Sequence, residues 1–219
     1  MKTAATSLSL LCLVFTLYLT TAGIAFAEQL QVDYKTFYSH LRKLNNDDTQ
    51  GLQFAFGFVN IDTGRLCQIN AARISTQKQQ IPLEVSPENR FTIPRERALR
   101  LADAMIILDM EEATNKCDIS VQLETKPEYL KANYSFEDIV YIREQYEAFF
   151  NEMGSFLSFM MPTVEGLVVQ FEDESLTTST PAGYQVIQGT LNLEEAFFEA
   201  KKPLRLPAKP LRITALATK

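Results

Sequence analysis

The sequence predicts an α+β protein, in which an antiparallel sheet or small sandwich packs against one long amphipathic helix. Short alternating stretches separated by turn signals recur from residue 52 to residue 124, as antiparallel strands do. Later, apolar residues over 139–160 repeat at spacings of three and four, which is typical of a helix with one buried face. Neither an internal repeat nor a linker divides the chain, so we expect residues 28–219 to form a single globular domain.

The first 27 residues predict a signal peptide. A short positive start, Met1-Lys2, precedes an apolar run over 8–19, and Ala25-Phe26-Ala27 has the pattern that signal peptidase cleaves. The apolar core is about 12 residues long, whereas a membrane-spanning helix needs roughly 20, so an uncleaved anchor is disfavoured. We therefore expect a mature chain that begins at Glu28 and has no transmembrane segment. It would be periplasmic or, alternatively, secreted.

Two cysteines remain after cleavage, Cys67 and Cys117. In an oxidising compartment an isolated pair of this kind predicts one structural disulfide. The alternative, a redox pair, usually has two residues between the cysteines, and this pair does not.

The elements before residue 125 are predicted from periodicity and turn residues. A first helix is expected over 32–44 with Asp33 as its cap. Alternation over 52–58 predicts a strand, and the turn after it predicts a hairpin with 66–74. A second short pair is expected over 81–85 and 90–93. The remaining elements of this part are a helix over 95–102 and strands over 104–108 and 118–124.

The longest helix is predicted to begin after Ser135, because Ser135 and Asp138 resemble a capping box. Its stripe over 139–149 should face the sheet. Past Met153 the apolar residues cover nearly the whole circumference, so that end is either buried all round or a partner surface formed by Phe156, Phe159 and Met160. Strands over 164–171 and 184–190, a helix over 194–200 and a closing edge strand over 211–216 complete the prediction.

Two stretches, ISVQLETKPEYLK (119–131) and YEAFFNEMGSFLSFMMP (146–162), resemble a family of exported Gram-negative proteins known as domain of unknown function 2987. The resemblance implies export and a single domain over most of the mature chain. It implies no activity and assigns no site residues.

Familiar catalytic patterns are absent from the sequence. His40 is the single histidine, and neither a G-x-S-x-G elbow nor a phosphate-binding loop occurs. One histidine and two cysteines cannot form the usual zinc sites, and the acidic clusters lack calcium-loop spacing. We therefore expect no metal and no cofactor, and interpret His40 as a partly exposed helical residue.

Charge is unevenly distributed along the mature chain. Residues 28–199 hold 27 acidic and 14 basic residues, whereas residues 200–219 hold six basic residues and no acidic one. An acidic protein of this kind is not expected to bind nucleic acid. The basic tail either complements the acidic body or faces outward and holds the protein near an anionic envelope surface.

A group of arginines around residues 90–100 offers one candidate anion site. Arg97 and Arg100 are three residues apart on the predicted helix, where they could bind a phosphate or carboxylate. Together these observations favour a non-enzymatic periplasmic protein that binds a protein partner or an envelope surface. The alternative is a carboxylate-based hydrolase of envelope glycans or peptides, which requires two carboxylates converging in a cleft.

Overall fold

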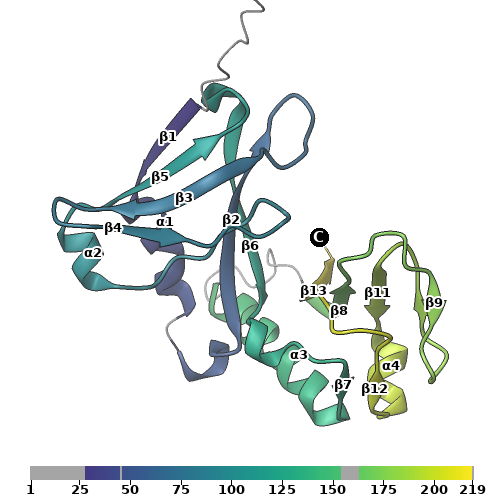
Figure 1. Cartoon of the computed structure of the whole chain (residues 1–219). Helices are drawn as coiled ribbons and strands as arrows, with labels where there is room; N and C mark the ends of the chain where they lie inside the picture. The colour runs from purple at the N-terminus through teal and green to yellow at the C-terminus, as the bar shows by residue number, and fades with distance from the viewer. Residues whose placement is uncertain (1–27, 45, 154–162, 219) are drawn as a thin grey trace, which may run out of the picture.

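The computed structural model describes residues 28–44, 46–153 and 163–218. Figure 1 shows the chain arranged in two bodies, which we call the N-terminal body (residues 28–125) and the C-terminal body (residues 126–218). The expected signal peptide and the expected partner surface of Phe156, Phe159 and Met160 lie outside the described residues. Several antiparallel sheets and a few helices make up the fold, which confirms the predicted α+β class.

The N-terminal body contains a four-stranded antiparallel sheet in the order β1-β5-β3-β4. Its strands are β1 (Glu28–Asp33), β5 (Met105–Met110), β3 (Ile69–Ser75) and β4 (Gln80–Leu83). Strand β1 occupies residues that were expected to begin a helix, so α1 (Tyr34–Leu41) begins later than predicted. Asp33 is nevertheless its cap, because the side chain accepts a hydrogen bond of 2.8 Å from the Lys35 N–H.

A long ribbon of two strands, β2 (Leu52–Asn60) and β6 (Cys117–Thr125), crosses the N-terminal body. The predicted hairpin between 52–58 and 66–74 is wrong, because β2 pairs along its whole length with β6. Only an isolated bridge between Val59 and Leu66 joins the two expected arms. Alternation identified β2 as a strand but did not identify its pairing partner. The aromatic side chains of β2 are buried between α1 and α3: the Phe56 ring centre lies 5.0 Å from that of Phe37, and the Phe54 ring centre lies 5.9 Å from that of Phe149. This burial fixes the face and register in which β2 pairs with β6.

The disulfide predicted from the cysteine count, Cys67–Cys117, is present, with Cα atoms 6.3 Å apart. It joins the chain just before β3 to the first residue of β6. The short helix α2 (Arg97–Leu101) lies between β4 and β5 and covers fewer residues than predicted. Single 3₁₀ turns occur at Arg42–Leu44, Asp47–Thr49, Thr114–Lys116 and Pro127–Tyr129.

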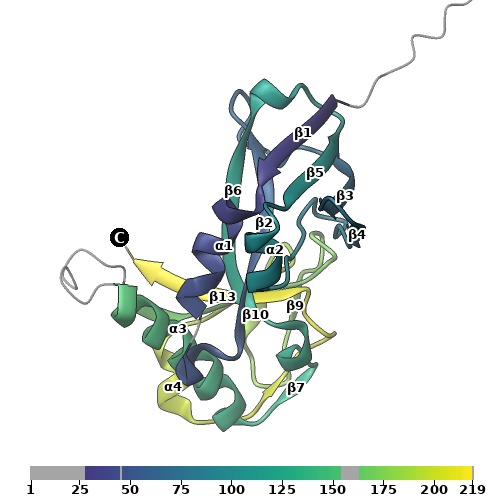
Figure 2. The same cartoon turned by 90° about the vertical axis from the view of Figure 1, so that its left-hand side faces the viewer.

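The C-terminal body is built on a three-stranded antiparallel sheet in the order β11-β8-β13. Its strands are β11 (Thr190–Leu193), β8 (Thr163–Gln170) and β13 (Arg212–Thr218). The remaining elements are α4 (Glu195–Ala200), the ribbon of β7 (Asn133–Tyr134) with β12 (Leu204–Arg205), and the ribbon of β9 (Thr178–Ser179) with β10 (Gln185–Val186). Strand β13 lies at an edge, as predicted, and crosses the β2–β6 ribbon at the junction of the bodies (Figure 2).

Helix α3 (Phe136–Met153), which belongs to the C-terminal body, also packs against the N-terminal body at the Asp47–Thr49 turn. Its predicted capping box is confirmed: the Ser135 N–H donates to Asp138 Oδ2 at 2.8 Å, and the Asp138 N–H donates to Ser135 Oγ at 3.1 Å. The predicted stripe is buried, and Tyr146 at its centre is inaccessible to solvent. The Tyr146 hydroxyl donates to the Ile213 carbonyl of β13 at 2.7 Å and lies 3.2 Å from Thr125 Oγ1 of β6. One hydrophobic cluster therefore spans both bodies.

Candidate anion-binding cleft

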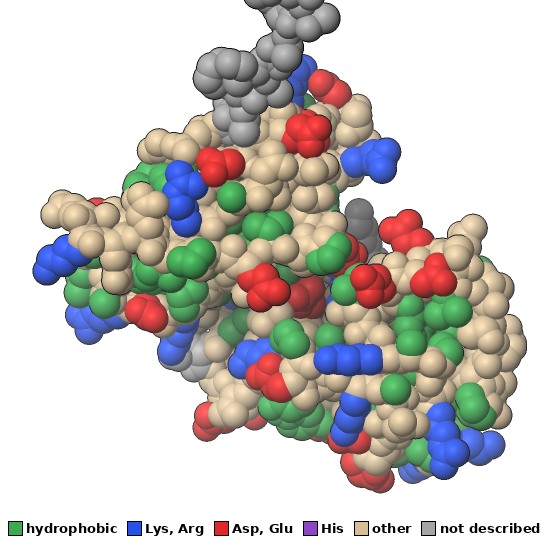
Figure 3. Space-filling view, viewed as in Figure 1, with side chains coloured by type: hydrophobic (Ala, Val, Ile, Leu, Met, Phe, Trp, Pro, Cys, Tyr) green, Lys and Arg blue, Asp and Glu red, His purple; other side chains and the backbone are tan. Residues whose placement is uncertain are grey.

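A cavity of about 340 Å³ lies at the junction of the two bodies. We call it the arginine cleft. Its charged and amide side chains come from β2, β6, β13 and the segment after β4, and they are Gln53, Glu84, Glu88, Arg90, Glu124 and Arg212. The space-filling view shows acidic and basic side chains together in the hollow between the bodies (Figure 3).

Arg90 is positioned by a tight turn after β4. The Asn89 N–H donates to the Ser86 carbonyl at 2.9 Å, and the Ser86 N–H donates to the Arg90 carbonyl at 2.7 Å. Asn89 has a positive φ of 59°, which asparagine tolerates better than most residues. The next residue, Phe91, is fixed to Phe56 of β2 by two backbone hydrogen bonds of 2.8 Å. The turn is therefore attached to the long ribbon, and Arg90 with it.

Gly57 on β2 allows this turn to approach the ribbon. A Cβ at position 57 would lie 2.9 Å from the Asn89 carbonyl oxygen, closer than real Cβ atoms approach. A side chain there would push the turn, and Arg90 with it, away from β2. The glycine thus has a packing reason to be where it is.

The Arg90 guanidinium is only partly satisfied. Its Nη2 donates a long hydrogen bond of 3.4 Å to Ser120 Oγ, whereas Nε and Nη1 are shielded from solvent and have no hydrogen-bond partner among the described residues. Burial lowers the pKa of Arg90, and the nearby Glu124 carboxylate opposes that shift. Arginine stays protonated even when its pKa is lowered, so Arg90, which lines the cleft, is a cation with two nitrogen atoms that lack a partner among the described residues.

Arg212, the first residue of β13, faces the same cleft from the C-terminal body. Its Nη1 donates to Gln122 Oε1 at 2.9 Å, and its Nη2 forms an ion pair with Glu88, while Nε is buried and has no partner among the described residues. The outward-facing role considered for the tail is therefore wrong for Arg212, because its side chain is only 8% exposed. The other described basic residues of the tail are exposed: Lys201, Lys202, Arg205 and Lys209.

Glu124 is a residue of β6, and its side chain lies near Arg90. It faces Gln53 across the ribbon, and the Gln53 amide donates to Glu124 Oε1 at 2.9 Å. Burial raises the pKa of Glu124, and the hydrogen bond from Gln53 and the charge of Arg90 only partly offset this. Glu124 is therefore easier to protonate than an ordinary glutamate.

The arginines singled out from sequence do not form one site. Arg100 lines a different cavity of about 440 Å³ with Lys35, Arg42 and Asp103, whereas Arg97 is exposed and does not line it. The Arg100 guanidinium lies 5.3 Å from the centre of the Tyr38 ring, and its Nε is buried with no partner among the described residues. Lys35 pairs with Asp103, so one positive charge of this cavity is already neutralised.

His40 has the structural role expected of it. It is half-buried on α1, with its ring edge-on to Phe54 at 5.8 Å, and burial lowers its pKa. Among the described residues, one group of potential metal ligands occurs, Cys67, Glu112 and Cys117. Its two cysteines form the disulfide, so their sulfur atoms are not available as thiolates.

Sequence reasoning missed most of the cleft. It noted a group of arginines around residues 90–100, which includes Arg90, but did not bring Arg212 to it. Glu124 carried no distinguishing signal, because it is one polar residue in an alternating strand. The Ser86-Asn89 turn between two short apolar stretches was the one local signal that fixed Arg90 beside the sheet.

The fold and the cleft define an α+β protein with a small charged cavity between two bodies. The chain belongs to the family described as protein of unknown function (DUF2987), whose sequence profile matches residues 26–171. This confirms the resemblance recognised in the sequence. The matched part includes Gln53, Glu84, Glu88, Arg90 and Glu124 but ends before Arg212.

No curated protein and no solved structure matches the chain. Across 28–44, 46–153 and 163–218, no helix has the length and apolar character needed to cross a bilayer.

Proposed function

We propose that this protein is an exported, non-enzymatic binding protein whose arginine cleft holds a small anionic ligand. The observation that carries the proposal is the set of three buried guanidinium nitrogen atoms, two on Arg90 and one on Arg212, that have no hydrogen-bond partner among the described residues. Arg90 and Arg212 are far apart in sequence, but both residues line one cavity.

Unpaired buried donors on a cation are costly. Leaving such a group unsatisfied costs about 1–3 kcal/mol, and more when the group is charged. A carboxylate or phosphate in the cleft would place acceptor oxygens and a negative charge beside both guanidiniums. The paired N–H donors of a planar guanidinium have the spacing to bind two oxygens of such an anion. Ligand binding would therefore relieve a penalty that the free protein bears.

Export is the second part of the proposal. The N-terminal pattern of residues 1–27 supports it, as does the disulfide, since disulfides persist mainly outside the cytosol. The periplasm is the compartment proposed. Fractionation of cells followed by N-terminal sequencing should place the protein there with Glu28 as its first residue, and a cytoplasmic protein that keeps Met1 would contradict the proposal.

Binding is tested by calorimetric titration of the mature protein with succinate and with inorganic phosphate. Arg90→Gln should weaken binding about 10- to 100-fold, since a hydrogen bond to a charged group contributes about 1.5–3 kcal/mol. Arg97→Gln is the matched control and should leave affinity unchanged, because Arg97 is exposed and outside the cleft. Binding that depends on Arg97 and not on Arg90 would move the site to α2 and overturn the proposal.

A hydrolase is the second candidate, because carboxyl groups gather in the same cleft. Glu124, with its raised pKa, suits a general acid, and Glu88, paired with Arg212, suits an ionised partner. Binding is favoured over hydrolysis because Gln53 and Arg212 already engage these carboxyl groups, while the Arg90 donors are unpaired. Release of reducing ends or free amines from envelope glycan or peptide by wild-type protein, and not by Glu124→Gln, would favour the hydrolase.

A further inference from the structure

We infer that the ligand of the arginine cleft is a zwitterion, carrying an ammonium as well as a carboxylate, as amino acids and short peptides do. The inference rests on the proposed function and specifies its ligand class. It starts from the charges that line the cavity: two guanidinium groups, of Arg90 and Arg212, and three carboxyl groups, of Glu84, Glu88 and Glu124.

The carboxyl groups differ in how they are already engaged. Glu88 is paired with Arg212, and Glu124 accepts from Gln53 beside Arg90. Glu84 is exposed and has no hydrogen bond or ion pair among the described residues. It therefore remains available to a positive group of the ligand, as Arg90 is to a negative one.

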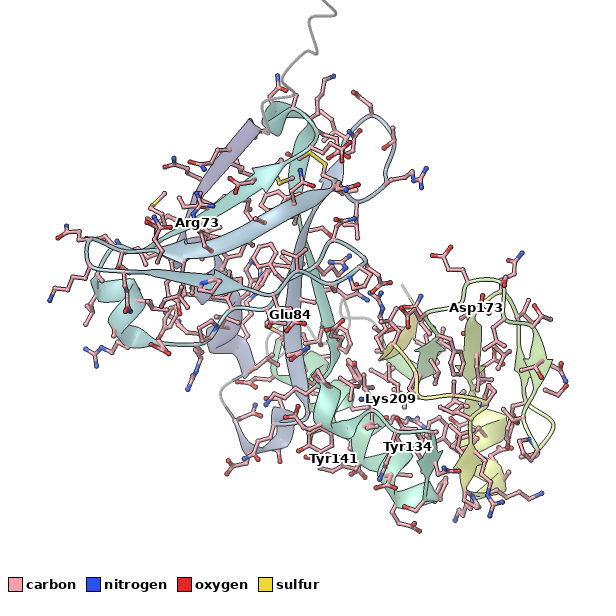
Figure 4. All side chains as sticks on the ribbon, in the orientation of Figure 1. Arg73, Glu84, Tyr134, Tyr141, Asp173 and Lys209 are labelled. Carbon is pink, nitrogen blue, oxygen red and sulfur yellow. A yellow bond between two sulfur atoms is a disulfide. The ribbon has the colours of Figure 1, made fainter. Side chains whose placement is uncertain are left out.

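The placement of Glu84 suits such a role. It follows β4, at the edge of the N-terminal sheet, and Figure 4 shows it beside the junction of the two bodies. Lys209, labelled on the C-terminal side of the junction, does not line the cavity. The cavity therefore has an acidic side chain without a partner at its rim, and a guanidinium that is only partly satisfied among its lining residues.

A simple anion would bind the cleft more weakly than a zwitterion. Because the three carboxyl groups outnumber the two guanidiniums by one, an added negative charge is repelled by Glu84, the carboxylate that neither arginine balances. An ammonium on the same ligand, placed near Glu84, removes that repulsion. The cavity volume of about 340 Å³ is at the small end of ligand pockets, which suits a molecule of this size.

Apolar side chains supply the remaining contact surface. Ala55, Val85, Phe91 and Leu211 also line the cavity. They would contact the carbon atoms that separate the two charges of the ligand, as apolar walls with a few placed polar groups do in most small-molecule sites. A ligand with charges at its ends and a short apolar middle matches this mixed lining.

The test uses the mature full chain and three dialanine probes: Ala-Ala with free termini, N-acetyl-Ala-Ala and Ala-Ala-amide. Alanine and Ala-Ala-Ala are added to distinguish amino acids from longer peptides. We expect Ala-Ala to bind, amidation to weaken binding at least tenfold, and acetylation to weaken it at least threefold. In Glu84→Gln, the acetylated and free peptides should bind equally well.

The controls separate this inference from the proposed function. Glu199→Gln removes an exposed carboxylate outside the cleft and should keep the preference for the free amine. If N-acetyl-Ala-Ala or succinate binds as tightly as Ala-Ala and Arg90→Gln weakens both, the zwitterion is refuted and the anion cleft stands. If none of the probes binds in a manner that depends on Arg90, the proposed function itself fails.

Discussion

Replacing Tyr146 with Phe removes one hydroxyl from the junction of the two bodies and leaves the ring in place. Tyr146 is fully buried on α3, and its hydroxyl donates to the Ile213 carbonyl at 2.7 Å and lies 3.2 Å from Thr125 Oγ1. Burial raises the pKa of Tyr146, so the hydroxyl keeps its proton and remains a donor. The substitution therefore removes a polar connection between α3, β6 and β13.

The magnitude follows from the partners left behind. A buried group that loses its partner costs about 1–3 kcal/mol, so we expect the free energy of unfolding to fall by about 2 kcal/mol. For a chain of this length, each kcal/mol corresponds to about 2–4 °C in Tm. The Tm of Tyr146→Phe should therefore be about 4–8 °C below that of the wild type.

Urea denaturation and thermal melts measure both quantities. Because both bodies contribute to one hydrophobic cluster, we expect one cooperative transition in each variant. Tyr141→Phe is the control: Tyr141 lies on the same helix, is 36% exposed, and should change stability by less than about 0.5 kcal/mol. A Tyr146→Phe protein as stable as that control would refute the account of the junction.

Three further predictions concern the disulfide, the buried carboxyl group and the tail. Replacing both Cys67 and Cys117 with Ser should lower the free energy of unfolding by about 4 kcal/mol, as expected for a closed loop of 50 residues. Thiol labelling of the unfolded, non-reduced wild type should find no free cysteine, and two free thiols would contradict the disulfide. Because the folded-state pKa of Glu124 is raised, its contribution to stability is present at low pH and is lost as pH rises through that pKa. The stability of the wild type relative to Glu124→Gln should therefore increase as pH falls from neutral. A stability difference that stays constant with pH would be inconsistent with a desolvated carboxyl group. Neutralising the exposed basic residues between 201 and 209 should reduce co-sedimentation with anionic vesicles at low salt, and equal sedimentation would remove the surface-binding role of the tail.

The elements that sequence predicted well are those with a strong local signal. The α3 cap depends on Ser135 and Asp138, three residues apart, and its buried stripe follows the helical period. The edge strand β13 followed from alternation after a proline-rich segment. Strand β1 was missed, and the expected helix was begun two residues too early, at Val32, because Asp33 is both the helix cap and the last residue of the strand.

Partner choice and the cleft could not be predicted in the same way. Strand β2 was assigned to a nearby partner, whereas it pairs with β6, some 60 residues further along, through contacts that only the folded core provides. Arg90 and Arg212 lie in one cavity although 122 residues separate them. A basic residue in an alternating tail has the same sequence signal whether it faces solvent or pairs with a distant glutamate such as Glu88.

The most direct test of the cleft is the NMR signal of the Arg90 Nε–H group during titration of the mature protein with succinate. The signal is assigned by its absence from Arg90→Lys, and the Nε–H of Arg97 serves as an internal reference. Because Arg90 Nε has no partner among the described residues, an anion that binds there should shift its signal progressively to saturation while that of Arg97 stays unchanged. An Arg90 signal that does not move while succinate binds elsewhere would contradict the central claim.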